Sequence, residues 1–117
     1  MSEFQRACAL ADVPEQGALY VEIDGLPVAV VRSDGELYAI EDTCSHEEVS
    51  LSEGEVEDGE IECWLHGSRF DLATGRPTSL PATRPIEVYP VKIDGDDVFV
   101  DIAHPRNSFQ MNQEQTA

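Results

Sequence analysis

Residues 44–66 read CSHEEVSLSEGEVEDGEIECWLH, with a cysteine and a histidine at each end of the segment. Cys44 and His46 form the first pair, Cys63 and His66 form the second, and sixteen residues separate the two pairs. The short spacing inside each pair lets a thiol and an imidazole converge on one small object. We therefore predict two loops that together offer two sulfur and two nitrogen ligands to a metal centre.

Two kinds of metal centre match this ligand set. Zinc binds two cysteines and two histidines in a tetrahedral site. A binuclear iron-sulfur cluster takes both thiolates on one iron and both imidazoles on the other, so that each loop contributes one ligand to each iron. The cluster fits better, because common zinc fingers pair cysteine with cysteine and histidine with histidine, whereas both pairs here are mixed. Chance explains the grouping poorly, since only Cys8 and His104 lie outside the two pairs.

The sequence around the ligand pairs predicts short antiparallel strands. Four of the eight glycines follow an aspartate, and Asp-Gly favours the tight turn of a hairpin. No apolar pattern keeps a helical period for more than about two turns, so we expect an all-β fold, a small sandwich or barrel, with at most one helical turn near residues 10–15. The expected strands are a meander over 18–23, 26–31 and 36–40, a strand over 60–65 that delivers Cys63 to its loop, and a hairpin over 86–93 and 96–102.

Length and composition narrow the class of protein. The 117 residues, 12.9 kDa, leave room for one domain. An excess of 24 acidic over 7 basic residues gives a formal charge of -17, which disfavours nucleic acids and anionic membranes as partners. We expect a cytoplasmic protein, because the sequence shows no signal peptide or spanning stretch and its three cysteines favour reduced thiols. The folded body is expected over 1–103 and a polar, flexible tail over 104–117.

The two ligand pairs, together with the His-Gly-Ser-Arg-Phe-Asp stretch at 66–71, resemble the Rieske 2Fe-2S ferredoxins. That family includes the small soluble electron carriers of bacterial ring-hydroxylating dioxygenase systems, and the resemblance covers residues 4–102. It implies a Rieske iron-sulfur domain, an antiparallel β-sandwich with a small cluster-binding subdomain on a larger base. It also implies one 2Fe-2S cluster of the Rieske type. By the same resemblance, the inner iron would be held by Cys44 and Cys63, and the outer, solvent-facing iron by His46 and His66.

Departures from the high-potential relatives predict a low reduction potential. Those relatives have a disulfide beside the cluster, and Val49 and Leu65 stand at the corresponding places here. They also direct a serine and a tyrosine hydroxyl at the cluster; this chain keeps Ser68 but has Phe70 in place of the tyrosine. One hydrogen-bond donor to the more negative, reduced cluster is therefore missing. We expect a potential near the bottom of the range of about -150 to +300 mV that Rieske centres span.

Three further features near the ligands have open roles. Trp64 stands where many relatives have proline, and it either packs against the body or belongs to a docking surface. The segment 80–85, with Pro81, resembles the family's third loop, which covers the cluster, or is only a connection to the next strand. Acidic residues crowd the span between the ligand pairs, as a solvated face or as a collar that steers the protein to basic patches: Glu47, Glu48, Glu53, Glu55, Glu57, Asp58, Glu60 and Glu62.

The resemblance implies an electron carrier with no catalytic residues of its own. Such a protein would take one electron from a flavin-dependent ferredoxin reductase and deliver it to a terminal oxygenase or similar acceptor, both with basic docking patches, and we expect it to act as a monomer. Three alternatives remain at this stage. They are a Rieske-like small subunit of a larger reductase of the nitrite reductase type, a Rieske protein of iron-sulfur cluster assembly, and a structural zinc module.

Overall fold

A computed structural model of the chain describes residues 4–44, 49–65, 67–80 and 84–106. These residues form strands and two short 3-10 helices, and no α-helix occurs among them. The predicted all-β class is confirmed. The elements in order are β1 (Gln5–Ala9), η1 (Leu10–Asp12), β2 (Gly17–Ile23), β3 (Leu26–Ser33), β4 (Glu36–Glu41), η2 (Leu51–Glu53), β5 (Val56–Glu57), β6 (Glu60–Glu62), β7 (Arg69–Asp71), β8 (Val88–Tyr89), β9 (Val91–Asp94) and β10 (Asp97–Val100).

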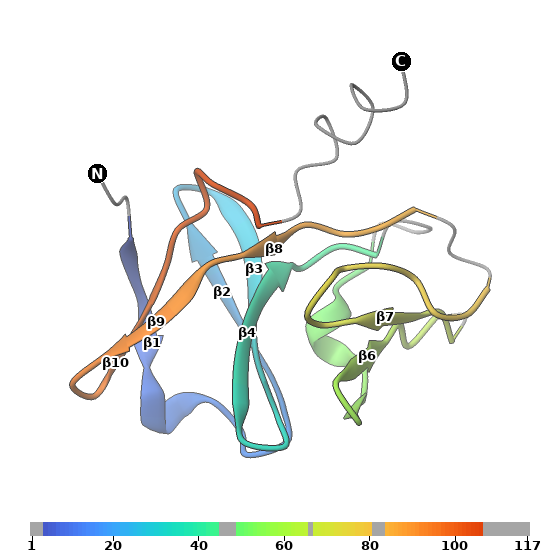
Figure 1. Cartoon of the computed structure of the whole chain (residues 1–117), viewed down its shortest axis with the longest axis horizontal. Helices are drawn as coiled ribbons and strands as arrows, with labels where there is room; N and C mark the ends of the chain where they lie inside the picture. The colour runs from blue at the N-terminus through green and yellow to red at the C-terminus, as the bar shows by residue number, and fades with distance from the viewer. Residues whose placement is uncertain (1–3, 45–48, 66, 81–83, 107–117) are drawn as a thin grey trace.

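The described strands pair into three antiparallel sheets. Two of them, with strand orders β2-β3-β4-β8 and β1-β10-β9, make the larger base at the left of Figure 1. The third, β5-β6-β7, is the small subdomain at the right. The meander predicted around the Asp-Gly pairs is present as β2, β3 and β4. Asp24, Asp34 and Asp58 all have φ values between 53° and 55°, the left-handed backbone that tight hairpin turns require.

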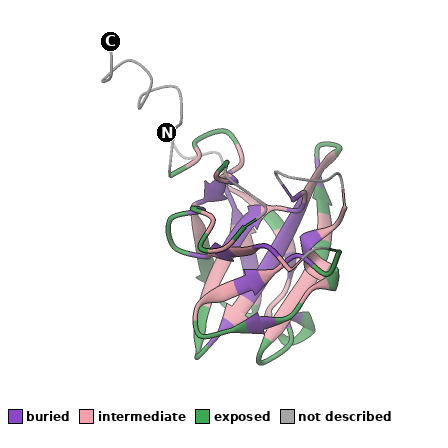
Figure 2. Ribbon diagram, turned by 90° about the vertical axis from the view of Figure 1, so that its right-hand side faces the viewer, coloured by how far each residue is buried: buried purple, intermediate pink, exposed green. Residues whose placement is uncertain are grey.

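Strand β3 separates two cores because both of its faces are buried. Successive side chains of a strand point to opposite faces. Val28 and Val30 pack in the core of the base with Val98 and Tyr89, whereas the alternate residues Ala29 and Val31 pack in a second core with Ile61, Phe70 and Leu72 of the subdomain. The nearly continuous apolar run of β3 is the sequence signature of such a strand. Figure 2 shows this buried interior, with exposed residues gathered at the turns.

A polar strap also ties the subdomain to the base. The buried Ser33 hydroxyl accepts hydrogen bonds from the Gln16 side-chain amide (3.1 Å) and from the Gly59 backbone N–H (3.0 Å). Gln16 also donates to the Val56 carbonyl at 3.3 Å and accepts from the Asp34 N–H at 3.0 Å. One turn of the base is therefore bonded to the β5–β6 hairpin, which fixes the subdomain against the sheet that carries Cys44.

Several boundaries differ from the expectations. The strand expected over 60–65 ends at Glu62, because the chain turns immediately at Cys63. The strand expected over 86–93 is divided into β8 and β9 by Pro90, which has no N–H for the ladder. Strands β1, β5 and β7 were not expected as pairing partners, and the helical turn near 10–15 is the 3-10 turn η1.

The described part of the expected C-terminal tail contacts the body. His104 Nδ1 lies 3.0 Å from Asp101 Oδ2, and the Arg106 N–H donates to the Val88 carbonyl at 2.7 Å. Residues 107–117 lie outside the described residues. Within the described residues, no helix has the length and apolar character needed to span a bilayer.

Candidate metal centre

Cys44 lies just beyond the end of β4, and its side chain is buried, with 2% exposed. Its N–H donates to the Val49 carbonyl at 3.1 Å. This bond links the two described residues that flank the first ligand segment. His46 belongs to this segment and lies outside the described residues.

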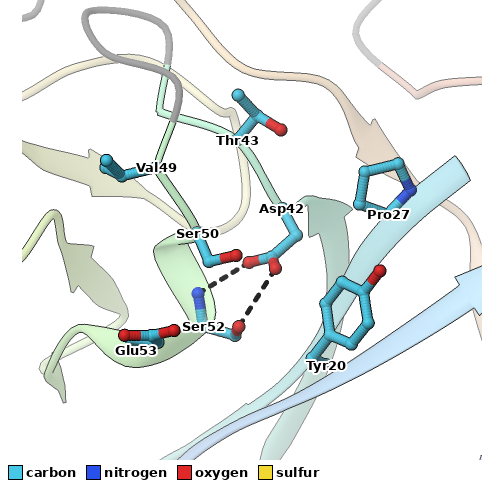
Figure 3. Close-up of a pocket in the computed structure, with 8 residues that line it drawn as sticks. All are labelled: Tyr20, Pro27, Asp42, Thr43, Val49, Ser50, Ser52 and Glu53. Carbon is cyan, nitrogen blue, oxygen red and sulfur yellow. Dashed lines mark hydrogen bonds between the residues drawn. The ribbon is translucent and has the colours of Figure 1, made fainter.

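Asp42 anchors the return of the first loop. Its carboxylate accepts from the Ser52 N–H (2.6 Å) and the Ser52 hydroxyl (3.0 Å), which caps the turn η2, and its own N–H donates to the Pro27 carbonyl at 3.1 Å. Figure 3 shows both carboxylate bonds in a cavity of about 470 Å³ that Tyr20 also lines. Burial raises the pKa of Asp42, although hydrogen bonds from Ser52 act in the opposite direction. Directly after β4, Asp42 thus contacts β3 through its backbone N–H and η2 through its carboxylate.

Cys63 is held in a tight turn directly after β6, with only 1% of its side chain exposed. Its N–H donates to the Ser68 carbonyl at 2.6 Å, and its carbonyl accepts from the Gly67 N–H at 2.9 Å. Gly67 has φ +79°, a left-handed conformation that a residue with a side chain adopts only with strain. The turn therefore leaves Trp64 and Leu65 exposed while Cys63 stays in the core. His66 lies outside the described residues.

The fold brings both predicted cysteine ligands into one core. Cys44 and Cys63 form no disulfide and lie in the cluster of buried residues that joins base and subdomain. Two buried cysteines on two separate turns, each with a histidine next in the motif, fit the mixed sulfur and nitrogen donor set of the predicted cluster. Among the described residues alone, no three His, Cys, Asp or Glu groups are close enough to hold a metal ion.

Gly54, which follows η2, lets the backbone there approach the end of β6, directly before Cys63. A Cβ built there would lie 1.6 Å from the Glu62 carbonyl oxygen, a distance that real atoms do not reach. Its φ of -89° is ordinary, so space and not backbone strain excludes a side chain. The adjacent bond from the Glu62 N–H to the Glu55 carbonyl, 2.8 Å long, keeps η2 and β6 together.

The predicted surroundings of the ligands divide into buried and exposed groups. Ser68 is fully buried, as its expected role beside the cluster requires, and Phe70 is buried in the same core as the cysteines. Trp64 is 52% exposed, Leu65 38% and Leu80 76%. Of the two roles open to Trp64, this exposure favours the docking surface over packing. Pro81 lies outside the described residues.

Part of the acidic collar is neutralised by one arginine. On β6, Glu60 pairs across the sheet with Glu57 on one side and Asp71 on the other, an arrangement in which like charges repel. Arg69 Nε lies 2.8 Å from Glu60, and its Nη1 lies 3.5 Å from Glu62. Glu47 and Glu48 lie outside the described residues. Residues 47–62 hold eight acidic residues and no lysine or arginine, so this span stays negative despite the pairing with Arg69.

Three residues that support the site were missed by reasoning from the sequence. They are Asp42, Gly54 and Ser79, whose hydroxyl contacts the turn after Cys63. Asp42 acts on Ser52, ten residues farther along the chain, and a lone aspartate carries no local signal of such a contact. The other two act across distances in sequence that no local pattern reveals.

Comparisons with known proteins match these features. The family model described as the Rieske [2Fe-2S] domain matches residues 3–90. The chain is 50% identical over 98 residues to the 3-phenylpropionate/cinnamic acid dioxygenase ferredoxin subunit of Shigella flexneri serotype 5b (strain 8401), a match that covers 82% of this chain and 91% of the relative.

Solved structures give the same picture. The ferredoxin of carbazole 1,9a-dioxygenase from Nocardioides aromaticivorans IC177 is 38% identical, with a TM-score of 0.80, and the match covers 86% of this chain and 98% of that one. A chain in the complex of reduced oxygenase and oxidized ferredoxin in carbazole 1,9a-dioxygenase is 37% identical, with a TM-score of 0.79 and coverage of 86% and 94%.

Proposed function

This chain belongs to the Rieske [2Fe-2S] domain family, and on that premise we propose that it is the ferredoxin of a dioxygenase system, which carries one electron at a time to an oxygenase. The observation that carries the proposal is the 50% identity to a dioxygenase ferredoxin subunit over 91% of that subunit's length. The related ferredoxin in complex with its oxygenase supports the same assignment. We propose further that the protein is a carrier with no catalytic site of its own.

The cofactor is one Rieske-type 2Fe-2S cluster, which the family assignment favours over zinc. When bound, it supplies a site that takes up and releases one electron. We propose that the thiolates of Cys44 and Cys63 hold one iron and the imidazoles of His46 and His66 the other. The two cysteines bury their sulfurs in the core that joins base and subdomain, which excludes water from that side of the site.

The exposed apolar side chains at the tip of the second ligand turn form the proposed docking surface. Trp64 and Leu65 stand on the turn itself, and Leu80 follows Ser79, whose hydroxyl is bonded to that turn. Three large apolar side chains on adjoining segments make a patch of the kind that protein interfaces bury. The acidic strand β6 leads into it, so the partner surfaces on reductase and oxygenase are expected to be apolar at the centre and basic at the rim.

Spectroscopy of the reduced protein tests the proposed function. After anaerobic expression and chemical reduction, an electron paramagnetic resonance spectrum should show the rhombic signal, with low average g value, of mixed histidine and cysteine ligation. His46→Ala and His66→Ala should lose or alter that signal, whereas His104→Ala, which changes the third histidine, should leave it unchanged. A colourless protein with stoichiometric zinc and no acid-labile sulfide would refute the proposal.

Electron-transfer kinetics test the docking surface. Stopped-flow oxidation of the reduced carrier by an oxygenase that accepts it should slow about tenfold or more in Trp64→Ala, the usual loss for a central interface tryptophan. Ile93→Ala is the matched control, because Ile93 is also 52% exposed but lies on β9, in the base. Added salt should slow the wild-type reaction. Equal rates for both variants would refute the assignment of the patch.

We also propose that a flavin-dependent reductase supplies the electron and that the protein works in the cytoplasm. None of the three described cysteines is in a disulfide, which fits a reducing compartment. Reduction by a purified ferredoxin reductase with NADH tests the first point. It should follow the same salt dependence as oxidation if both partners use the same acidic collar.

A further inference from the structure

Both peptide groups of Gly67, the residue that follows His66, are fixed by hydrogen bonds. Its N–H donates to the carbonyl of Cys63 at 2.9 Å. Its carbonyl accepts from the hydroxyl of Ser79 at 3.3 Å. The same hydroxyl accepts from the Arg69 N–H at 3.0 Å. One serine side chain thus bridges the backbone on both sides of Ser68, at the point where the second ligand turn ends and β7 begins.

Ser79 is delivered to this place by a hairpin that does not depend on its side chain. After β7 the chain reverses, and Asp71 N–H donates to the Arg76 carbonyl at 2.8 Å. Phe70 and Pro77 form an antiparallel bridge, and the Thr78 N–H donates to the Arg69 carbonyl at 2.7 Å. These backbone contacts would remain without the Ser79 hydroxyl. Loss of the hydroxyl would remove its two bonds, from the Arg69 N–H and to the Gly67 carbonyl, and would leave these backbone contacts in place.

We propose that Ser79 is a positioning residue for the cluster: through the Gly67 carbonyl it fixes the peptide that joins Gly67 to Ser68, and so holds the turn that carries Cys63 in one conformation. The inference rests on the proposed function. At φ +79° Gly67 is the least restricted residue of the turn, so its conformation depends on bonds from outside. The Cys63 carbonyl fixes one end of Gly67 and Ser79 fixes the other.

The test compares four forms of the cluster-loaded protein. They are wild type, Ser79→Ala, Ser79→Thr, which keeps the hydroxyl, and Thr78→Ala, which changes an exposed neighbour whose known bond is made by its backbone. The readouts are the g values and line widths of the reduced protein and the rate at which visible absorbance is lost with a chelator. Ser79→Ala should broaden the resonance and speed the loss about three- to tenfold, the equivalent of one hydrogen bond.

The outcomes separate a positioning role from a structural one. Ser79→Thr should restore the wild-type line widths, and Thr78→Ala should match wild type. An unchanged spectrum in Ser79→Ala, or equal disturbance in Ser79→Thr, would overturn the proposal. So would loss of the β-sheet circular dichroism in Ser79→Ala, because that would make the residue structural. A wild-type protein without the Rieske signal would defeat the proposed function as well, whereas a normal wild-type signal confines the failure to Ser79.

Discussion

Replacing Gly54 by alanine should be among the most damaging single-methyl additions that this chain can receive. The new Cβ would lie 1.6 Å from the Glu62 carbonyl oxygen and 2.8 Å from its carbon. Both atoms are backbone, so no rotamer change relieves the overlap. The segment that follows η2 and strand β6 would have to separate by roughly 1.8 Å to restore ordinary contact at 3.4 Å.

The magnitude follows from two losses. Forced movement of packed backbone costs about 1–3 kcal/mol. Separation also stretches the 2.8 Å bond from the Glu62 N–H to the Glu55 carbonyl, which contributes about 0.5–1.5 kcal/mol. We therefore expect Gly54→Ala to lower the free energy of unfolding by about 2–4 kcal/mol. With a urea slope of about 2 kcal/mol per molar, the midpoint falls by about 1–2 M.

Urea unfolding followed by far-UV circular dichroism measures this shift, and visible absorbance of the same samples reports retention of the cluster. Gly25→Ala is the control, because its Cβ meets nothing within 4 Å although its φ is +81°. Left-handed strain in Gly25→Ala should lower the free energy of unfolding by only about 1 kcal/mol, since alanine also restricts the unfolded chain, which offsets part of the strain. If Gly25→Ala proved as damaging as Gly54→Ala, or if the Gly54→Ala midpoint moved by less than about 0.5 M, the steric explanation would be wrong.

Three other substitutions probe the contacts around the site. Ser33→Ala removes the acceptor of the Gly59 N–H and should lower the free energy of unfolding by about 1–3 kcal/mol in urea titrations; an unchanged midpoint would mean that the strap is dispensable. Asp42→Ala should accelerate the chelator-driven loss of cluster absorbance, since it leaves the Ser52 N–H without its acceptor. Asp42→Asn retains an acceptor and should accelerate this loss less; equal effects of the two variants would contradict the role given to the Asp42 carboxylate. Burial raises the pKa of Glu41, so the folded state binds its proton more tightly and loses stability as pH rises through that pKa. The stability gained in Glu41→Gln should therefore grow from about pH 4 to about pH 7. A gain in stability that shrinks over this range would contradict a raised pKa of Glu41.

Local patterns predicted the parts of the fold that local chemistry controls. The Asp-Gly turns and the β2–β4 meander follow from residues adjacent in sequence. Cys44 and Cys63, which the mixed ligand pairs assign to two loops, lie outside the strands, three residues after β4 and one residue after β6. The very short strands β5 and β7 carry too few residues for a period to be visible, and their pairing depends on contacts across the subdomain core.

The missed supports of the site share one physical property. Gly54 matters because of a carbonyl eight residues away, and Ser79 because of a carbonyl twelve residues away. Neither contact leaves a trace in composition or periodicity, since a glycine and a serine are ordinary residues of loops. Sequence reasoning therefore identified the groups expected to bind the metal but not the backbone contacts that hold them.

The turn that begins at Cys63 carries both this buried cysteine and two exposed apolar side chains. The N–H and carbonyl of Cys63 are both bonded within the turn, to Ser68 and Gly67. With both ends closed, the side chains of Trp64 and Leu65 have no place in the core and are presented outward. The same two hydrogen bonds therefore set both the position of the buried Cys63 thiol and the outward position of Trp64 and Leu65. An inserted residue between Cys63 and Ser68 would break both, whereas a changed side chain at 64 or 65 alters only the surface. We therefore expect substitutions at Trp64 and Leu65 to alter the proposed docking surface without moving Cys63.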